Sequence, residues 1–149
     1  MSVDVQQAAP QQAVPLITGV HHVGLTVRDV EASERWYERV LGLTREFVEP
    51  HANGTGYAVV MTCPGSALSL GLDHHADADG QVFNECRTGL DHLALQVESR
   101  ADLDLWAARL DALGVKREAI HETSEPVPYA LIVFRDLDEI QLEMMWFGA

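Results

Sequence analysis

Two histidines and a glutamate, His22, His92 and Glu143, are the side chains of this 149-residue chain whose types and spacing best suit chemistry. Neutral imidazoles bind divalent Fe, Zn, Ni and Cu, and a carboxylate adds charge and hardness to the ligand set. Three protein ligands leave coordination positions open for water and substrate, which is typical of catalytic rather than structural sites. The three residues form such a site only if the fold brings them to one surface.

The chain contains an internal repeat, which places His22 and His92 at equivalent positions. Residues 19–27 match residues 89–97 at an offset of 70, with a glycine, a histidine and alternating apolar residues in common. Further on the offset becomes 72, over 41–46 with 113–118, 57–60 with 129–132, and 68–72 with 140–144. The repeat predicts a single domain, 17–147, made of two similar modules at about 17–75 and 88–147.

Each module is predicted to have the element order βαβββ. The first strand alternates apolar and polar residues. A helix follows, with Asp29 or Ser99 as its N-cap and Gly42 or Gly114 at its end. The predicted strands are 20–27, 44–49, 56–62 and 67–72 in the first module and 90–97, 116–120, 128–134 and 140–146 in the second. This pattern predicts an α+β fold in which the two modules form a cupped mixed sheet.

Two segments are predicted to lie outside the modules. Residues 1–16, rich in Gln, Ala and Pro, read as a flexible tail without chemistry. Residues 73–88 are polar and irregular, and they form a longer connection than is usual in compact domains. Long connections are often functional, so this loop is a candidate lid.

The alternation of side chains along a strand predicts which residues share a face. The apolar positions of the first strands face the helices, which leaves His22 and His92 on the opposite face. The same parity places Glu143 on the face away from the helices. If each sheet curls, that face lines a concavity and the three residues converge. Gly71 is the counterpart of Glu143 in the first module and offers no side chain, so the site is open on one side.

Other residues offer competing sites. Asp73, His74 and His75 form a rival metal cluster, but they fall in the predicted loop and lack a fixed geometry. His21 has the opposite parity to His22 and is expected to face the helix side or solvent. Residues 77–80 resemble part of a calcium loop but lack its distant glutamate.

Composition excludes several classes of function. The chain carries 10 Lys and Arg against 23 Asp and Glu, a net charge of −13, whereas nucleic acids and anionic membranes attract basic surfaces. No apolar run approaches the roughly 18–20 residues that span a bilayer. Cys63 and Cys86 are too few for a disulfide scaffold, and the N-terminus lacks the pattern of a secretory signal. A cytoplasmic location is therefore expected.

Four stretches of the sequence resemble the vicinal oxygen chelate superfamily, which includes glyoxalase I, extradiol dioxygenases, fosfomycin-resistance enzymes and bleomycin-resistance proteins. These stretches are 21–29, 36–43, 89–94 and 134–143, and the resemblance covers about residues 17–147. It implies paired βαβββ modules around a divalent metal that is chelated by two neighbouring oxygens of a substrate. The family's metal ligands fall by position on His22, His92 and Glu143, and the resemblance also implies a homodimer.

The chain departs from part of this family. Glyoxalase I uses a fourth ligand, which falls near Gly71 here, so three ligands are more similar to the extradiol dioxygenases and the fosfomycin-resistance enzymes. The latter need a cationic pocket, and this chain has a single lysine, Lys116. Bleomycin-resistance proteins generally lack the metal ligands, which this chain has.

The sequence therefore predicts a metal-dependent enzyme acting on a small organic molecule, most like a dioxygenase or a glyoxalase-type lyase. Fe²⁺ is the favoured metal, with Mn²⁺, Ni²⁺ or Zn²⁺ as alternatives. Tyr129 and His75, with His74 beside it, are candidates for a general acid or base. The competing prediction is a dimeric protein that binds a drug or natural product without turnover. Neither nucleic acid nor a membrane is expected as a partner.

Overall fold

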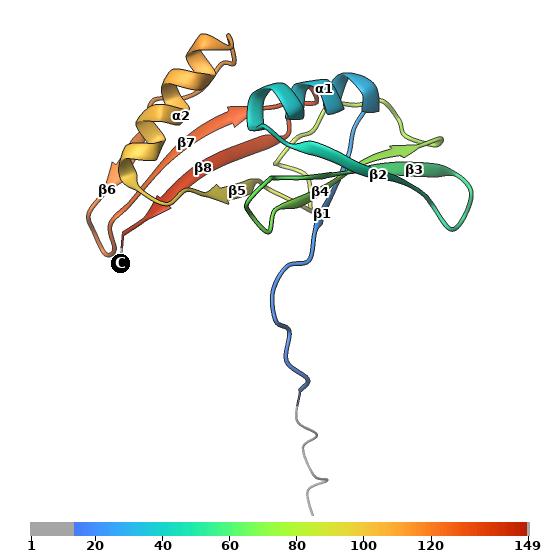
Figure 1. Ribbon diagram of the computed structural model, residues 1–149, viewed down its shortest axis with the longest axis horizontal. Helices are drawn as coiled ribbons and strands as arrows, with labels where there is room; N and C mark the ends of the chain where they lie inside the picture. Colours follow the sequence, from blue (N-terminus) through green and yellow to red (C-terminus); the bar gives the residue numbers. More distant parts are fainter. Residues whose placement is uncertain (1–13, 149) are drawn as a thin grey trace, which may run out of the picture.

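The computed structural model describes residues 14–148 (Figure 1), in the order β1 (Val23–Thr26), α1 (Val30–Leu41), β2 (Thr44–Pro50), β3 (Gly56–Thr62), β4 (Ser69–His75), β5 (Leu93–Gln96), α2 (Arg100–Ala112), β6 (His121–Thr123), β7 (Tyr129–Arg135) and β8 (Gln141–Phe147). The strands form two four-stranded sheets, β1-β4-β3-β2 and β5-β8-β7-β6. In each sheet the first and last strands of the module are parallel, and the other neighbours are antiparallel. The predicted α+β fold of two βαβββ modules is confirmed.

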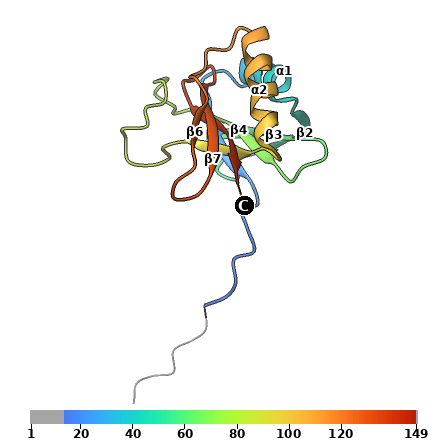
Figure 2. The same cartoon turned by 90° about the vertical axis from the view of Figure 1, so that its left-hand side faces the viewer.

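Both helices cover the same side of the sheets, and the opposite faces are left open (Figure 1). The connection between β4 and β5 runs out to one side of the sheets (Figure 2). Residues 14–22 lead away from the fold and are exposed, and residues 1–13 of the predicted tail lie outside the described residues. Within 14–148, neither helix is both long and apolar enough to cross a membrane.

The core lies between the helices and the sheets, on the face that the alternation predicted. Leu25 and Val27 are buried, whereas Gly24 and Thr26 between them are exposed. The same alternation runs through β7, where Ala130, Ile132 and Phe134 are almost fully buried and the residues between them are not. The odd-numbered residues of β7 therefore belong to the open face.

The helix boundaries follow the predicted caps. The Asp29 carboxylate accepts a hydrogen bond from the Ala32 amide, and Gly42 ends α1 in the left-handed conformation that glycine favours. Ser99 and Asp102 form a reciprocal capping box at the start of α2.

The Ser99→Ala substitution is expected to lower the free energy of unfolding by about 1 kcal/mol, because it removes the side-chain acceptor for the Asp102 amide. Chemical denaturation measures the loss. The matched control is Glu98→Ala at the exposed neighbouring position, which is expected to change stability by less than about 0.5 kcal/mol. Equal stability of the two variants would contradict the capping role.

Two predicted boundaries were wrong. Residues 116–120 do not form a strand: they make a single bridge, Arg117 to Phe134, and the second strand of the second module is the short β6. The predicted loop at 73–88 begins later, because β4 continues through His75. The whole of β4 pairs with β3, and His75 lies opposite Gly56 at the start of β3.

The register of the repeat also differs from the prediction in the third strand. Val59 pairs with Leu72, whereas Ile132 pairs with Met144, the counterpart of Leu72. Val59 therefore corresponds to Ile132 rather than to Leu131, and the turn before the last strand is one residue shorter in the second module. A slip of one residue moves a side chain to the other face of a sheet. Tyr129 is thus not the counterpart of Tyr57 and lies on the open face.

The last turn of the second module contacts the helix of the first. The buried Tyr37 hydroxyl donates a hydrogen bond to Asp136 over 2.9 Å, and Asp136 also accepts from the Asp138 and Ile140 amides. Arg28, just after β1, pairs with Asp138. These contacts join the two modules through the turn between β7 and β8.

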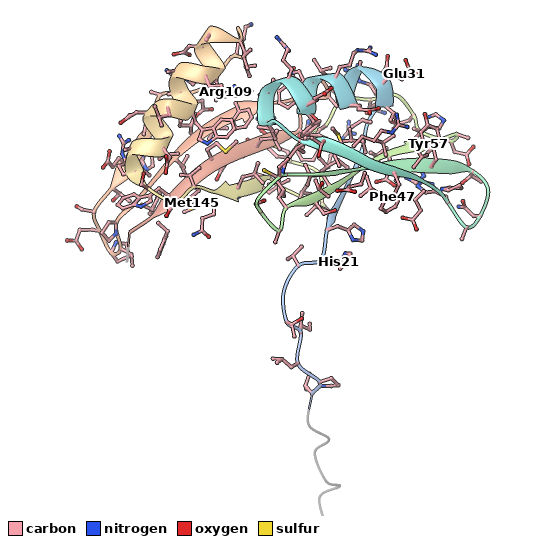
Figure 3. All side chains as sticks on the ribbon, in the orientation of Figure 1. His21, Glu31, Phe47, Tyr57, Arg109 and Met145 are labelled. Atoms are coloured by element: carbon pink, nitrogen blue, oxygen red, sulfur yellow. The ribbon has the colours of Figure 1, made fainter. Side chains whose placement is uncertain are left out.

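A second contact joins the two helices. The Arg109 guanidinium, on α2, donates hydrogen bonds to the carbonyl oxygens of Arg39 and Val40 at the end of α1, 2.7 and 2.8 Å away. Figure 3 shows Arg109 between the helices. Carbonyls at a helix C-terminus lack partners within the helix, and a cation there is favourable.

Candidate functional site

His92 and Glu143 are brought together by the parallel pairing of β5 with β8. Ala94 lies opposite Glu143, and His92 is two residues earlier on the same face. His92 Nε2 and Glu143 Oε2 are 3.8 Å apart. This distance exceeds a hydrogen bond and is close to the roughly 3–3.5 Å between two ligands of one ion with bonds near 2.1 Å.

The Glu143 side chain is largely buried, but its carboxylate oxygens keep contact with solvent. The residue is 8% exposed. Within residues 14–148, no donor lies within hydrogen-bonding distance of its carboxylate, whereas the other buried acids, Asp136 and Asp138, have several partners. Buried carboxylates are normally paired or bound to a metal. The observed environment of Glu143 therefore fits a metal ligand.

The His92 ring is oriented by its neighbour Asp91. His92 Nδ1 and Asp91 Oδ1 are 2.6 Å apart, which leaves Nε2 directed toward Glu143. The hydrogen bond that the His92 ring donates to Asp91, and to a smaller extent the charge of Glu143, raise the pKa of His92 although burial opposes them. Histidines that bind metals commonly place a carboxylate at the other ring nitrogen. Sequence reasoning missed this role of Asp91, although its position beside a candidate ligand was a usable signal.

His22 lies on the open face of the first sheet, directly before β1. It lines a hollow of about 380 Å³ together with residues of the open face, among them Ser69 and Gly71. His21 is exposed to solvent, one of the two orientations predicted for it, and it lines the same hollow with its Nδ1 2.9 Å from that of His22. A single chain does not complete the predicted triad, because among the described residues His22 has no ligand atom within 4.8 Å of both His92 and Glu143.

Gly71 holds the position predicted for a missing fourth ligand. It pairs with Gly24, just as Glu143 pairs with Ala94. The first module therefore presents backbone, with no side chain, where the second module presents a carboxylate.

Tyr129 and His75 lie at the far ends of the open faces. Tyr129 pairs with Phe147, four residues along β8 from Glu143, which corresponds to about 13 Å. His75 ends β4, whereas Val23, next to His22, pairs with Leu70 near the start of β4. Figure 3 shows Phe47 and Met145 on the open sides of their sheets and Tyr57 on the helix side.

The rival cluster predicted in the loop exists in a different form. Asp73 and His75 lie on β4 rather than in a loop, and His74 between them faces the helix side beside Tyr57. His51, which sequence reasoning missed, takes the third position: ligand atoms of His51, Asp73 and His75 all lie within 4.8 Å of one another. The signal that could have found His51 was the hairpin register, which brings the end of β2 beside the end of β4.

Comparison with known proteins agrees with this architecture. The family model of the Glyoxalase/Bleomycin resistance protein/Dioxygenase superfamily matches residues 19–144. A solved glyoxylase/bleomycin resistance protein/dioxygenase domain from Frankia sp. EAN1pec is 36% identical, with a TM-score of 0.78, and the match covers 89% of this chain and 100% of that chain.

More distant structures share the fold. Lactoylglutathione lyase from Agrobacterium tumefaciens is 22% identical with a TM-score of 0.64, over 87% of this chain and 94% of that chain. The fosfomycin resistance protein FosX from Listeria monocytogenes is 18% identical with a TM-score of 0.62, over 90% of this chain and 96% of that chain. No curated protein gives a significant match.

Proposed function

Because the chain belongs to the glyoxalase/bleomycin resistance protein/dioxygenase superfamily, we propose that it is a divalent-metal-dependent enzyme of the vicinal oxygen chelate type. Its substrate is a small organic molecule, and its chemistry is closest to that of a dioxygenase or a glyoxalase-type lyase. The observation that supports the proposal is the pairing of His92 with the largely buried Glu143 side chain at 3.8 Å.

The proposed metal ligands are His22, His92 and Glu143. Two imidazole nitrogens and one carboxylate oxygen suit Fe²⁺ best, and the same donors accept Mn²⁺, Ni²⁺ or Zn²⁺. A divalent metal bound there supplies Lewis acidity and a template for two neighbouring substrate oxygens.

The chain's own residues prepare this site in two ways. Asp91 holds the His92 ring so that Nε2 remains available to the metal. Gly71 contributes no ligand, so coordination positions stay open for a substrate that binds through two oxygens; the Asp73 carboxylate lies near this side, with Oδ2 3.1 Å from where a Cβ atom of residue 71 would be. Acid–base roles for Tyr129 and His75 stay predictions.

A second copy of the chain is proposed to complete the site. His22 is exposed, and no group of the described chain brings it together with His92 and Glu143. In a dimer with two-fold symmetry, the open face of the first module of one chain meets the open face of the second module of its partner. Each of the two equal sites then takes His22 from one chain and His92 and Glu143 from the other.

Subunit mixing tests this arrangement. The His22→Ala and Glu143→Ala proteins, each also carrying His75→Ala so that the cluster of His51, Asp73 and His75 does not bind the ion, are expected to retain almost no iron after gel filtration. Unfolding and refolding them together is expected to restore about a quarter of the iron of the His75→Ala protein, because half of the dimers are hybrids and each hybrid has one intact site of two. Refolded His75→Ala protein provides the reference. If the mixture retains no more iron than either variant, the site closes within one chain.

The enzymatic proposal is tested by anaerobic reconstitution with Fe²⁺, Mn²⁺, Ni²⁺ or Zn²⁺, followed by assay. A panel of catechols with dioxygen and of methylglyoxal with glutathione covers the two reaction types. We expect turnover with at least one metal and its loss in His92→Ala. Turnover that is unaffected by His92→Ala would contradict the proposed site.

The second candidate is a binding protein that holds a drug or natural product without turnover. The hollow of about 380 Å³ on the first sheet favours it, because Phe47, Ala58 and Val60 give that hollow an apolar part. Purified protein that carries an apolar ligand and no metal would support this candidate over catalysis.

A further inference from the structure

We propose that His51, Asp73 and His75 form a second metal site, separate from the one at His92 and Glu143. It is the one set of three His, Cys, Asp or Glu side chains within 14–148 whose ligand atoms all lie within 4.8 Å of one another. His51 Nε2 and Asp73 Oδ1 are 2.9 Å apart, and the rings of His51 and His75 have their centroids 4.7 Å apart.

The fold holds the three side chains on one face. Asp73 and His75 alternate along β4, so both belong to the open face. His51 directly follows β2, where its amide donates to the Gly56 carbonyl and its own carbonyl accepts from the Gly54 amide, both over 2.9 Å. The turn between β2 and β3 therefore fixes the backbone of His51 beside the end of β4.

Glycines provide the space that the cluster occupies. A Cβ atom at Gly24 or Gly71 would lie 3.0 or 3.1 Å from Asp73 Oδ2, closer than ordinary van der Waals contact. A Cβ at Gly56 would lie 2.8 Å from His51 Nδ1. Three neighbouring positions thus lack the side chain that would displace a ligand of the cluster.

The donor set matches that of the first site and accepts the same first-row divalent metals, Fe²⁺ and Zn²⁺ among them. In a tetrahedral site with bonds near 2.1 Å, two imidazoles and a carboxylate lie roughly 3.3 Å apart. His51 and Asp73 are already near that separation, and the ring of His75, the most exposed of the three, has to turn inward to complete the set. A fourth position remains for water or an anion.

This site is distinct from the proposed site at His22. The start of β4, at Ser69, lies beside the His22 end of β1, and Asp73 is four residues further along, which corresponds to about 13 Å. Both positions nevertheless line the same hollow. Its lining contains Glu46, Glu49 and Asp73 but no lysine or arginine. A divalent ion at the second site therefore offsets part of the negative charge of this hollow.

Cobalt titration of the full chain in a Glu143→Gln background tests the second site, because that substitution disables the first. We expect one Co²⁺ per chain, seen in the visible absorption of the ion. His51→Ala, Asp73→Asn and His75→Ala are each expected to raise the dissociation constant by at least about tenfold. The matched control is His74→Ala, which removes a histidine of the same strand from the helix side.

The outcomes separate this site from the first. Cobalt binding that survives Glu143→Gln and His74→Ala but is lost in His75→Ala supports the second site, whether or not the first site binds metal. Binding that is equally tight in His75→Ala and His74→Ala would overturn it, as would the absence of any binding in the Glu143→Gln background. Because His75 is the most exposed of the three ligands, a folding defect is not expected there, and thermal unfolding of each variant confirms that it is folded.

Discussion

The Glu143→Gln substitution is expected to weaken the binding of Fe²⁺ at the first site by about 100-fold, as measured by competition with a chelator. The substitution removes the charge that a divalent ion needs while keeping the shape of the side chain. The carboxylate has no hydrogen-bond donor in the described chain and lies 3.8 Å from His92 Nε2, so loss of its charge removes only a partly solvated attraction to His92. The metal-free variant is therefore expected to unfold with a free energy within about 1 kcal/mol of that of the wild type.

The two readouts together distinguish a ligand from a structural residue. A structural glutamate would lower stability when replaced and leave metal affinity unchanged. Glu118→Gln is the matched control, since Glu118 is exposed and its side chain makes no hydrogen bond within 14–148. If Glu143→Gln and Glu118→Gln bind Fe²⁺ equally well, Glu143 is not a ligand.

The Asp136→Ala substitution is expected to lower the free energy of unfolding by about 3–4 kcal/mol, measured by denaturant titration. Asp136 accepts hydrogen bonds from the Tyr37 hydroxyl and from two backbone amides, and truncation leaves these buried donors without a partner. Asp136→Asn keeps the acceptor oxygen for the amides, so its loss should be less than half as large. Equal losses in the two variants would show that the hydrogen bonds are not the source of the effect.

The pH dependence of stability provides a second test of the same contact. Burial raises the pKa of Asp136, and the hydrogen bonds that it accepts oppose the increase only in part. The native state therefore holds the proton of the Asp136 carboxyl group more tightly than the unfolded chain does. The contribution of Asp136 to stability falls as the pH rises through its native pKa. The stability of Asp136→Asn relative to the wild type should therefore improve from about pH 4 to pH 7. An opposite slope would contradict the raised pKa.

The fold could be predicted from the sequence because several local signals agree. Asp29 and Ser99 cap the helices, and Leu25, Val27 and their counterparts mark the core face. The weak point was the second strand of the second module, where 116–120 were predicted and β6 lies at 121–123. Exposed, short strands bury few apolar residues, so their sequence carries little periodicity to read.

The candidate site could be predicted only in part, because strand parity fixes faces but not distances. Parity placed His92 and Glu143 on one face, and their 3.8 Å separation follows from the pairing of β5 with β8. His51 escaped notice because its neighbours in space are 22 and 24 residues away, across two hairpins. The match of Tyr129 with Tyr57 at one sequence offset hid a register that differs by one residue and that places Tyr129 on the open face.

The hydrogen bond from the Tyr37 hydroxyl to Asp136 makes the first module depend on the second. Each half contains a complete sheet and helix, yet the deepest polar contact of the first half's helix comes from the second half. A fragment ending near residue 80 would leave the Tyr37 hydroxyl facing solvent and the adjoining apolar helix face uncovered. A single module on its own would therefore need a second copy to cover this helix face, as symmetric dimers do.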